Sequence, residues 1–245
     1  MRRWQIILLA GLIGVASLTL IPIEMLIARP IAPFTLRLLA CIQPAILTAL
    51  AVIAGEYCAK RVGLSAPLVD AWVAGRSGGA VIRRQIEPTL AVGIGLGAIL
   101  VLYAHWLAPH IMAPTAHGGM AGFDLPILSK LLYGGVTEEI LMRYGTLSLT
   151  AWLAWRLMRQ APDAKARAIW IGIVLSAFLF AAGHLPFLFL VTPHTPGWIV
   201  AAVMVSNAVP GIALGLLFWR RGLEAAVMAH MIAHLSFWLV TLTGV

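Results

Sequence analysis

Carboxyl and imidazole side chains lie inside apolar stretches in the second half of this sequence. The stretches read GGVTEEILMRYG, AFLFAAGHLPF and EAAVMAHMIAHLSF, and their ionisable residues are Glu138, Glu139, Arg143, His184, His230 and His234. Ionisable groups in such surroundings are costly to bury and usually serve a function. Carboxylates and imidazoles are also the groups that enzymes use to activate water. These residues are the candidate site, and a polar network that only packs helices together is the alternative.

The glutamate pair offers two carboxyl groups with different surroundings. Glu139 and Arg143 are spaced i,i+4, so on a helix they share a face and can form an ion pair. Glu138 points about 100° away from Glu139 on a helix and has no local cationic partner there. A buried carboxyl without a partner can take up and release a proton, as a general base acting on water must. The alternative is a neutralised Glu–Arg pair that joins two helices.

Two of the histidines also share a helix face. His230 and His234 are spaced i,i+4, about 6 Å apart along a helix, and could bind one metal ion together. The HExxH motif of soluble zinc proteases has this spacing with a glutamate beside the first histidine. Met231 occupies that place here, so a catalytic carboxylate must come from another helix. Glu138 and Glu139 are the candidates.

The third histidine, His184, stands alone on its apolar segment. Phe180 lies one turn earlier, and Pro186 follows two residues later and disturbs the helix there. A single histidine in such a segment is more often a hydrogen-bonded packing residue than a ligand. A functional role for His184 is therefore indicated only by its combination with the glutamate pair and with the other two histidines.

The elements that would position these side chains are membrane helices. Of the 245 residues, 61% are hydrophobic and only 11% are charged, whereas about a quarter of the residues of a soluble domain are charged. We expect a single integral membrane domain over 1–245, an all-α bundle of polytopic transmembrane helices. The apolar runs predict seven of them, at 4–28, 35–58, 88–108, 126–156, 168–191, 197–219 and 223–241.

Two of the predicted segments are unusual. The fourth helix is too long for one straight crossing, so we expect it to be tilted or broken near the glycines Gly134 and Gly135. The polar segment 60–87 contains SAPLVDAWVAGRSGG, which could form an amphipathic helix on the cytoplasmic surface.

The net charge of +8 fits membrane orientation better than nucleic-acid binding. Most of the 17 basic residues fall in short clusters between alternate apolar runs, and no aromatic-plus-basic pattern typical of RNA binding occurs. The positive-inside rule then predicts a cytoplasmic N-terminus and an outside C-terminus. The short loops resemble those of a prokaryotic membrane protein, so we expect a prokaryotic inner or plasma membrane. The expected partners are the lipid bilayer and a membrane-associated protein or peptide, and no nucleic acid.

The three stretches together resemble a known family. Its motifs are EExxxR, matched by Glu138, Glu139 and Arg143, then FxxxH, matched by Phe180 and His184, then a histidine with a partner four residues later, matched by His230 and His234. The sequence resembles the CAAX protease and bacteriocin-processing family, also called the Abi or type II CAAX prenyl endopeptidase-like family. The resemblance covers about 125–240, the expected catalytic core, and leaves 1–124 as accessory helices.

The resemblance implies hydrolysis of a peptide bond inside the membrane. If the roles of the family's motif residues apply here, Glu138 and His184 activate a water molecule, and Arg143 holds Glu139 in place. His230 and His234 would stabilise the oxyanion. The best-known prenyl proteases carry asparagine at the position of His234, so the inference to prenylated substrates is weaker here.

Two alternatives stay open. In the first, one divalent ion, Zn²⁺, lowers the pKa of the attacking water and is bound by His184, His230, His234 and Glu138. In the second, the chain is not an enzyme but a transporter subunit, an immunity protein or a scaffold, whose buried polar groups serve packing or proton movement. The sequence predicts neither the substrate nor the oligomeric state.

Overall fold

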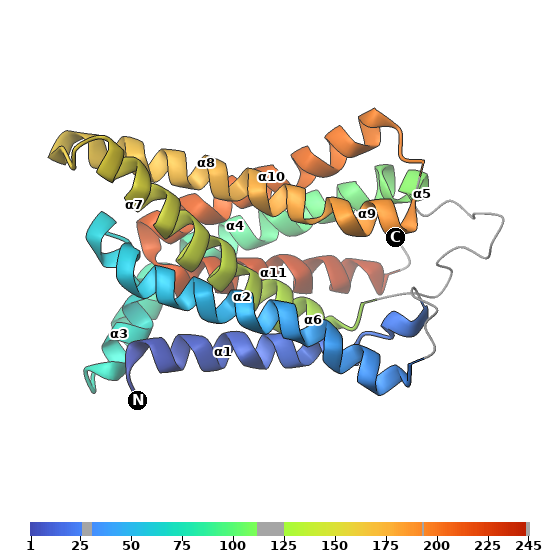
Figure 1. Cartoon of the computed structure of the whole chain (residues 1–245), viewed down its shortest axis with the longest axis horizontal. Coiled ribbons are helices and arrows are strands. Elements are labelled where there is room, and N and C mark those ends of the chain that lie inside the picture. The colour runs from blue at the N-terminus through green and yellow to red at the C-terminus, as the bar shows by residue number, and fades with distance from the viewer. Residues whose placement is uncertain (26–30, 112–124, 193, 244–245) are drawn as a thin grey trace.

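The computed structural model describes residues 1–25, 31–111, 125–192 and 194–243, and in these ranges every regular element is a helix (Figure 1). Six helical stretches are long and apolar enough to cross a membrane. They run over Arg3–Leu20, Pro33–Val62, Gly79–Trp106, Pro162–Leu190, Gly197–Arg221 and Leu223–Thr241. The protein is therefore an integral membrane protein, and a further helical run over 127–157 is compatible with the seven passes predicted from the sequence.

The helical run over 127–157 carries the glutamate motif and is continuous, and we call it the motif helix. It consists of α6 (Ile127–Ser129), wide π-helical turns over Lys130–Glu138 and Ile140–Leu147, and α7 (Ser148–Leu157). The sequence left a tilted helix or a break near Gly134 and Gly135 as alternatives, and the structure has no break there, because both glycines lie within the first π-helical stretch. The run instead crosses the bundle obliquely (Figure 1). Such π-helical turns are rare and occur frequently at functional sites.

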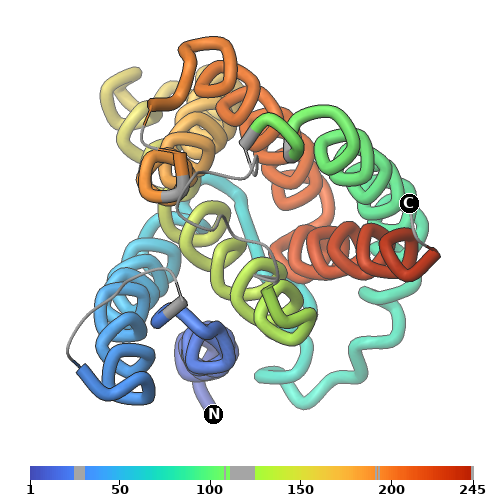
Figure 2. The backbone as a smooth tube through the Cα atoms, turned by 90° about the vertical axis from the view of Figure 1, so that its right-hand side faces the viewer, coloured from blue at the N-terminus to red at the C-terminus, as the bar shows by residue number. Residues whose placement is uncertain are grey.

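This motif helix lies at the centre of the bundle. It contacts α1 (Arg3–Ser17), α2 (Pro33–Val62), α8 (Lys165–Gly183) and α11 (Leu223–Thr241), which surround it in the end-on view (Figure 2). The other long helices are α4 (Gly79–Trp106) and α10 (Gly197–Arg221). The shorter elements are 3₁₀ turns at Leu18–Leu20, Ile23–Met25 and Pro162–Ala164, and the helices α3 (Pro67–Val73), α5 (Ala108–Ile111) and α9 (Leu185–Val191).

Several predicted boundaries differ from the structure. The helix predicted over 4–28 ends at Ser17 and is followed only by 3₁₀ turns as far as Met25, while residues 26–28 lie outside the described residues. Helix α4 begins at Gly79 rather than at 88, and Pro88 lies inside it. Hydropathy marks where apolar residues begin, whereas the hydrogen-bonded helix continues through the polar residues that precede them. The predicted surface helix is present only as the short α3, which ends at Val73.

The helix predicted at 168–191 is interrupted. Helix α8 ends at Gly183, α9 begins at Leu185, and His184 lies at the junction between them. Pro186 stands in the first turn of α9, where the missing N–H of proline costs no hydrogen bond. The predicted disturbance near Pro186 is confirmed.

The start of α1 and the end of α11 lie at opposite ends of the bundle, as the predicted odd number of passes requires (Figure 1). The N-terminal end of the bundle also holds α3, the end of α2, the start of α4 and the connections α7–α8 and α10–α11. These are the segments that contain most of the basic residues. We call this the basic end of the bundle.

Candidate functional site

Glu139 joins the motif helix to α11 through its carboxylate. Its Oε1 accepts a hydrogen bond from Nδ1 of His230 at 2.8 Å and lies 3.2 Å from Nη1 of Arg143. Glu139 and Arg143 are fully buried, with side-chain exposures of 0% and 1%. The predicted ion pair is present, and the same carboxylate fixes the proton of His230 on Nδ1.

Arg143 connects this pair to two further helices. Its Nη2 donates to the backbone carbonyl of Gly211 on α10 at 3.2 Å, and its guanidinium carbon lies 5.1 Å from the centre of the Phe180 ring on α8. A buried guanidinium needs such partners, because an unpaired buried charge is costly. Arg143 therefore holds three helices around one point.

His184 lies beside the same aromatic ring. Its ring centre is 4.7 Å from that of Phe180 in an edge-on contact, and the His230 ring is 6.4 Å from Phe180, also edge-on. The Nδ1 of His184 lies 2.9 Å from the carbonyl oxygen of Phe180. With Nδ1 donating to this carbonyl, Nε2 of a neutral His184 is left as an acceptor. His184 is half-buried, so this nitrogen is not sealed in the core.

Glu138 lies within electrostatic reach of both histidines and of the ion pair. The charged groups that act on its carboxyl are His230, His184, Glu139 and Arg143. Glu138 is half-buried, unlike Glu139. Within the described part of the chain it makes no ion pair, so its carboxylate is available for chemistry.

His234 stacks on His230 and faces the motif helix. The two ring centres are 4.9 Å apart, and the ring planes differ by 21°. A Cβ atom added to Gly134 would lie 2.9 Å from Nε2 of His234. Glycine at 134 therefore lets the imidazole approach the backbone of the motif helix.

The five carboxyl and imidazole groups and Arg143 thus come together from the motif helix, the α8–α9 junction and α11. Residues 121–236, a segment that contains all of them, match the family described as type II CAAX prenyl endopeptidase Rce1-like. We call residues 121–236 the Rce1-like segment after this similarity. No curated protein and no solved structure matches the chain. The family match supports a membrane hydrolase of the CAAX protease type and covers just under half of the chain.

The described residues of the Rce1-like segment do not present a zinc site in this arrangement. Among the described residues, no three His, Cys, Asp or Glu side chains are placed to hold one metal ion together. A metal–nitrogen bond lies in the plane of the imidazole, and the stacked planes of His230 and His234 do not converge on one ion. The donors predicted for Zn²⁺ therefore do not fit a metal without rotation of these rings.

A polar group outside the Rce1-like segment touches the motif helix and was not predicted. Tyr144, which follows Arg143 in the sequence, donates to Glu56 on α2 at 2.7 Å. Arg3 on α1 is 5% exposed, and its guanidinium nitrogens lie 3.7 Å from Glu56 and 3.5 Å from Asp70. The sequence feature that could have indicated this group is Glu56, a single acid near the end of an apolar run. This group ties the N-terminal helices to the motif helix.

Proposed function

We propose that this protein is an intramembrane endopeptidase that hydrolyses a peptide bond of a membrane-associated protein or peptide. One observation carries the proposal: the Glu139–Arg143 pair, the Phe180 ring and the imidazoles of His184 and His230 form one continuous group of contacts inside the helix bundle. The half-buried Glu138 is adjacent to Glu139 on the motif helix. The family match of residues 121–236 supports the same reaction class. A prenylated C-terminal tail is one substrate class, and leader peptides and membrane regulators are others.

In the proposed reaction, Glu138 is the general base. It takes a proton from a water molecule whose oxygen attacks the carbonyl carbon of the peptide bond. His184 accepts a hydrogen bond from the same water through Nε2, since its Nδ1 is engaged with the Phe180 carbonyl. The tetrahedral intermediate then collapses, the C–N bond breaks, and the proton passes from Glu138 to the leaving amine.

The oxyanion of the intermediate is stabilised by His230 and His234 in this proposal. For His230 to donate from Nε2 while Nδ1 donates to Glu139, the ring must carry both protons and act as an imidazolium. Its positive charge is then balanced by the Glu139 carboxylate at 2.8 Å. His234, stacked alongside, supplies the second donor. Removal of one such donor typically lowers kcat by about 10²- to 10³-fold.

The decisive variant is Glu138→Gln, which keeps the shape of the side chain and removes the base. We expect cleavage to be abolished and the helix bundle to be retained. Membrane peptides would be compared by mass spectrometry between cells that produce the wild type and cells that produce the variant. Glu87→Gln, at an exposed position on α4, is the matched control and should leave the peptide pattern unchanged.

The same comparison distinguishes the enzyme from a transporter subunit, an immunity protein or a scaffold. An identical set of peptides from wild-type and Glu138→Gln cells, with equal protein levels, would contradict the protease proposal. Gel filtration of the purified variant in detergent checks that it folds.

A further inference from the structure

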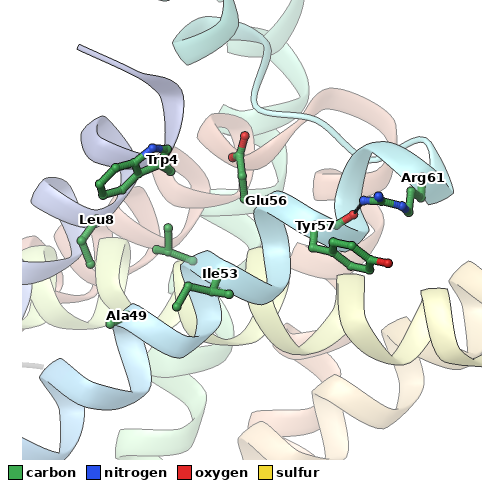
Figure 3. Close-up of a pocket in the computed structure, with 8 residues that line it drawn as sticks. Trp4, Leu8, Ala49, Ile53, Glu56, Tyr57 and Arg61 are labelled. Carbon is green, nitrogen blue, oxygen red and sulfur yellow. Dashed lines mark hydrogen bonds between the residues drawn. The ribbon is translucent and has the colours of Figure 1, made fainter.

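A groove opens between the two N-terminal helices, away from the site described above. Its volume is about 460 Å³, within the roughly 300–1,000 Å³ range of small-molecule sites. Its walls are mostly apolar, and Figure 3 shows side chains of α1 on one side and those of α2 on the other. The lining residues are Trp4, Leu8, Ala49, Val52, Ile53, Glu56, Tyr57 and Arg61.

Basic and aromatic side chains form a row at the end of this groove. The guanidinium carbon of Arg61 lies 3.7 Å from the centre of the Tyr57 ring, and Arg61 donates to the Tyr57 carbonyl. Tyr57 contacts Trp152 on α7 edge-on at 5.4 Å, and Arg156 lies 5.6 Å from the Trp152 ring. Both arginines are exposed. Two aromatic rings in contact thus hold two guanidinium groups on one surface.

The one acid in the groove does not cancel this positive charge. Glu56 accepts a hydrogen bond from Tyr144 and lies 3.7 Å from the Arg3 guanidinium, so its charge is already offset inside the protein. Arg61 has five N–H donors, and its recorded bond to the Tyr57 carbonyl engages one of its nitrogens. The end of the groove therefore remains a site for an anion.

We propose that one anionic phospholipid occupies the surface formed by the groove and the Arg61–Tyr57–Trp152–Arg156 row. Its phosphate is bound by Arg61 and Arg156, and an acyl chain lies along Leu8 and Ile53 in the groove. The surface lies at the basic end of the bundle, where helix α2 ends at Val62 (Figure 1).

The choice of a phospholipid follows from position and chemistry. Tryptophan and tyrosine concentrate at the depth of lipid headgroups, and Trp4 and Tyr57 are 40% and 51% exposed. Basic residues near a membrane surface attract anionic lipids by about 1 kcal/mol each. An apolar groove that ends at Arg61, with Arg156 on the adjoining aromatic row, matches a molecule with one long apolar chain and one phosphate.

The test is lipid binding to the purified full-length protein in detergent, counted by native mass spectrometry. The probes are phosphatidylglycerol and phosphatidylcholine with the same acyl chains. We expect one phosphatidylglycerol to bind more tightly than phosphatidylcholine, and the affinity to fall roughly fivefold for each of Arg61→Gln and Arg156→Gln. Arg84→Gln removes an exposed charge from the same end of the bundle and should have no effect.

A second pair of variants tests the apolar part of the surface. Ile53→Trp fills the groove and should abolish the tight binding of phosphatidylglycerol. Ile94→Trp enlarges an exposed apolar residue of α4 and should leave that binding unchanged. Equal binding of the two lipids, or an equal loss with Arg84→Gln, would overturn the proposal. So would a farnesylated peptide that occupies the groove while phosphatidylglycerol does not, because the groove would then bind substrate.

Discussion

A single carboxylate oxygen organises the candidate site at the level of residues. Glu139 Oε1 accepts from His230 and pairs with Arg143, so it sets the orientation of a ring and neutralises a buried cation. Glu138, one residue earlier, makes neither contact and stays half-buried. Two adjacent glutamates therefore have separate tasks in the proposed mechanism: one positions, and the other reacts.

Glu139→Gln should destabilise the protein because it leaves Arg143 buried without its counter-charge. Breaking a buried pair by removing one partner typically costs about 3–5 kcal/mol. The double variant Glu139→Gln, Arg143→Met removes both charges and should recover much of that loss in thermal unfolding measured in detergent. We expect both variants to lack peptidase activity, since His230 loses its anchor. Equal stability of the single variant and the wild type would contradict this account of the pair.

His234→Asn distinguishes oxyanion stabilisation from metal binding. Asparagine keeps a hydrogen-bond donor but is a poor zinc ligand, so the variant should retain most activity, whereas His234→Ala should lose about 10²-fold or more. Activity would be measured with and without a chelator, and zinc by elemental analysis. Loss of activity in His234→Asn together with loss of stoichiometric zinc would support the metal alternative.

The motif helix is the element that makes this site possible. Gly134 admits His234, and Gly135 admits Met231, since an added Cβ would lie 2.4 Å from Met231 Cγ. These close approaches place α11 directly against the π-helical turns. The glycines that suggested a helix break in the sequence therefore serve contact between two helices.

Gly134→Ala should lower activity more than stability. The new Cβ would lie 2.9 Å from the far end of the His234 ring, which can rotate away and leave the oxyanion position. Gly95→Ala on α4 is the control, because its Cβ meets open space. That control should keep full activity and gain up to about 1 kcal/mol of stability from helix propensity. Similar peptide cleavage by Gly134→Ala and wild type would show that His234 need not approach this closely.

The sequence was most informative where a residue type is rare in its surroundings. Buried charges in apolar runs predicted Glu139 and Arg143 as a pair, and hydropathy predicted the all-helical membrane bundle, whose six long apolar helices are compatible with about seven passes. Neither signal could place the start of α4, because the backbone hydrogen bonds of the helix begin at Gly79, in the polar residues that precede the apolar run. The contact between Tyr144 and Glu56 joins residues far apart in the chain, and only the packing of α2 on the motif helix brings them together.

The whole molecule is one bundle in which the N-terminal helices also support the motif helix. Thr137 on that helix donates to the Gly11 carbonyl of α1 at 2.8 Å, and Ser129 donates to the Ser17 carbonyl at 2.8 Å. A Cβ at Gly14 would lie 2.1 Å from Thr137 Oγ1. The backbone of α1 therefore packs closely against the motif helix. Lipid acyl chains cannot replace this contact, because they have no hydrogen-bond donors for the carbonyls of Gly11 and Ser17.

Two fragments, 1–111 and 112–245, should consequently assemble when they are produced together in one membrane. Close helix approach through small residues is a main source of association in bilayers, where apolar area alone gives no driving force. Gly14→Leu in the first fragment should abolish co-purification, because the larger side chain separates α1 from Thr137. Ile13→Ala, at a side chain that is 50% exposed, should leave assembly intact. If the second fragment alone were folded and cleaved peptides at the rate of the full chain, α1 and α2 would be accessory to the fold as well as to the chemistry.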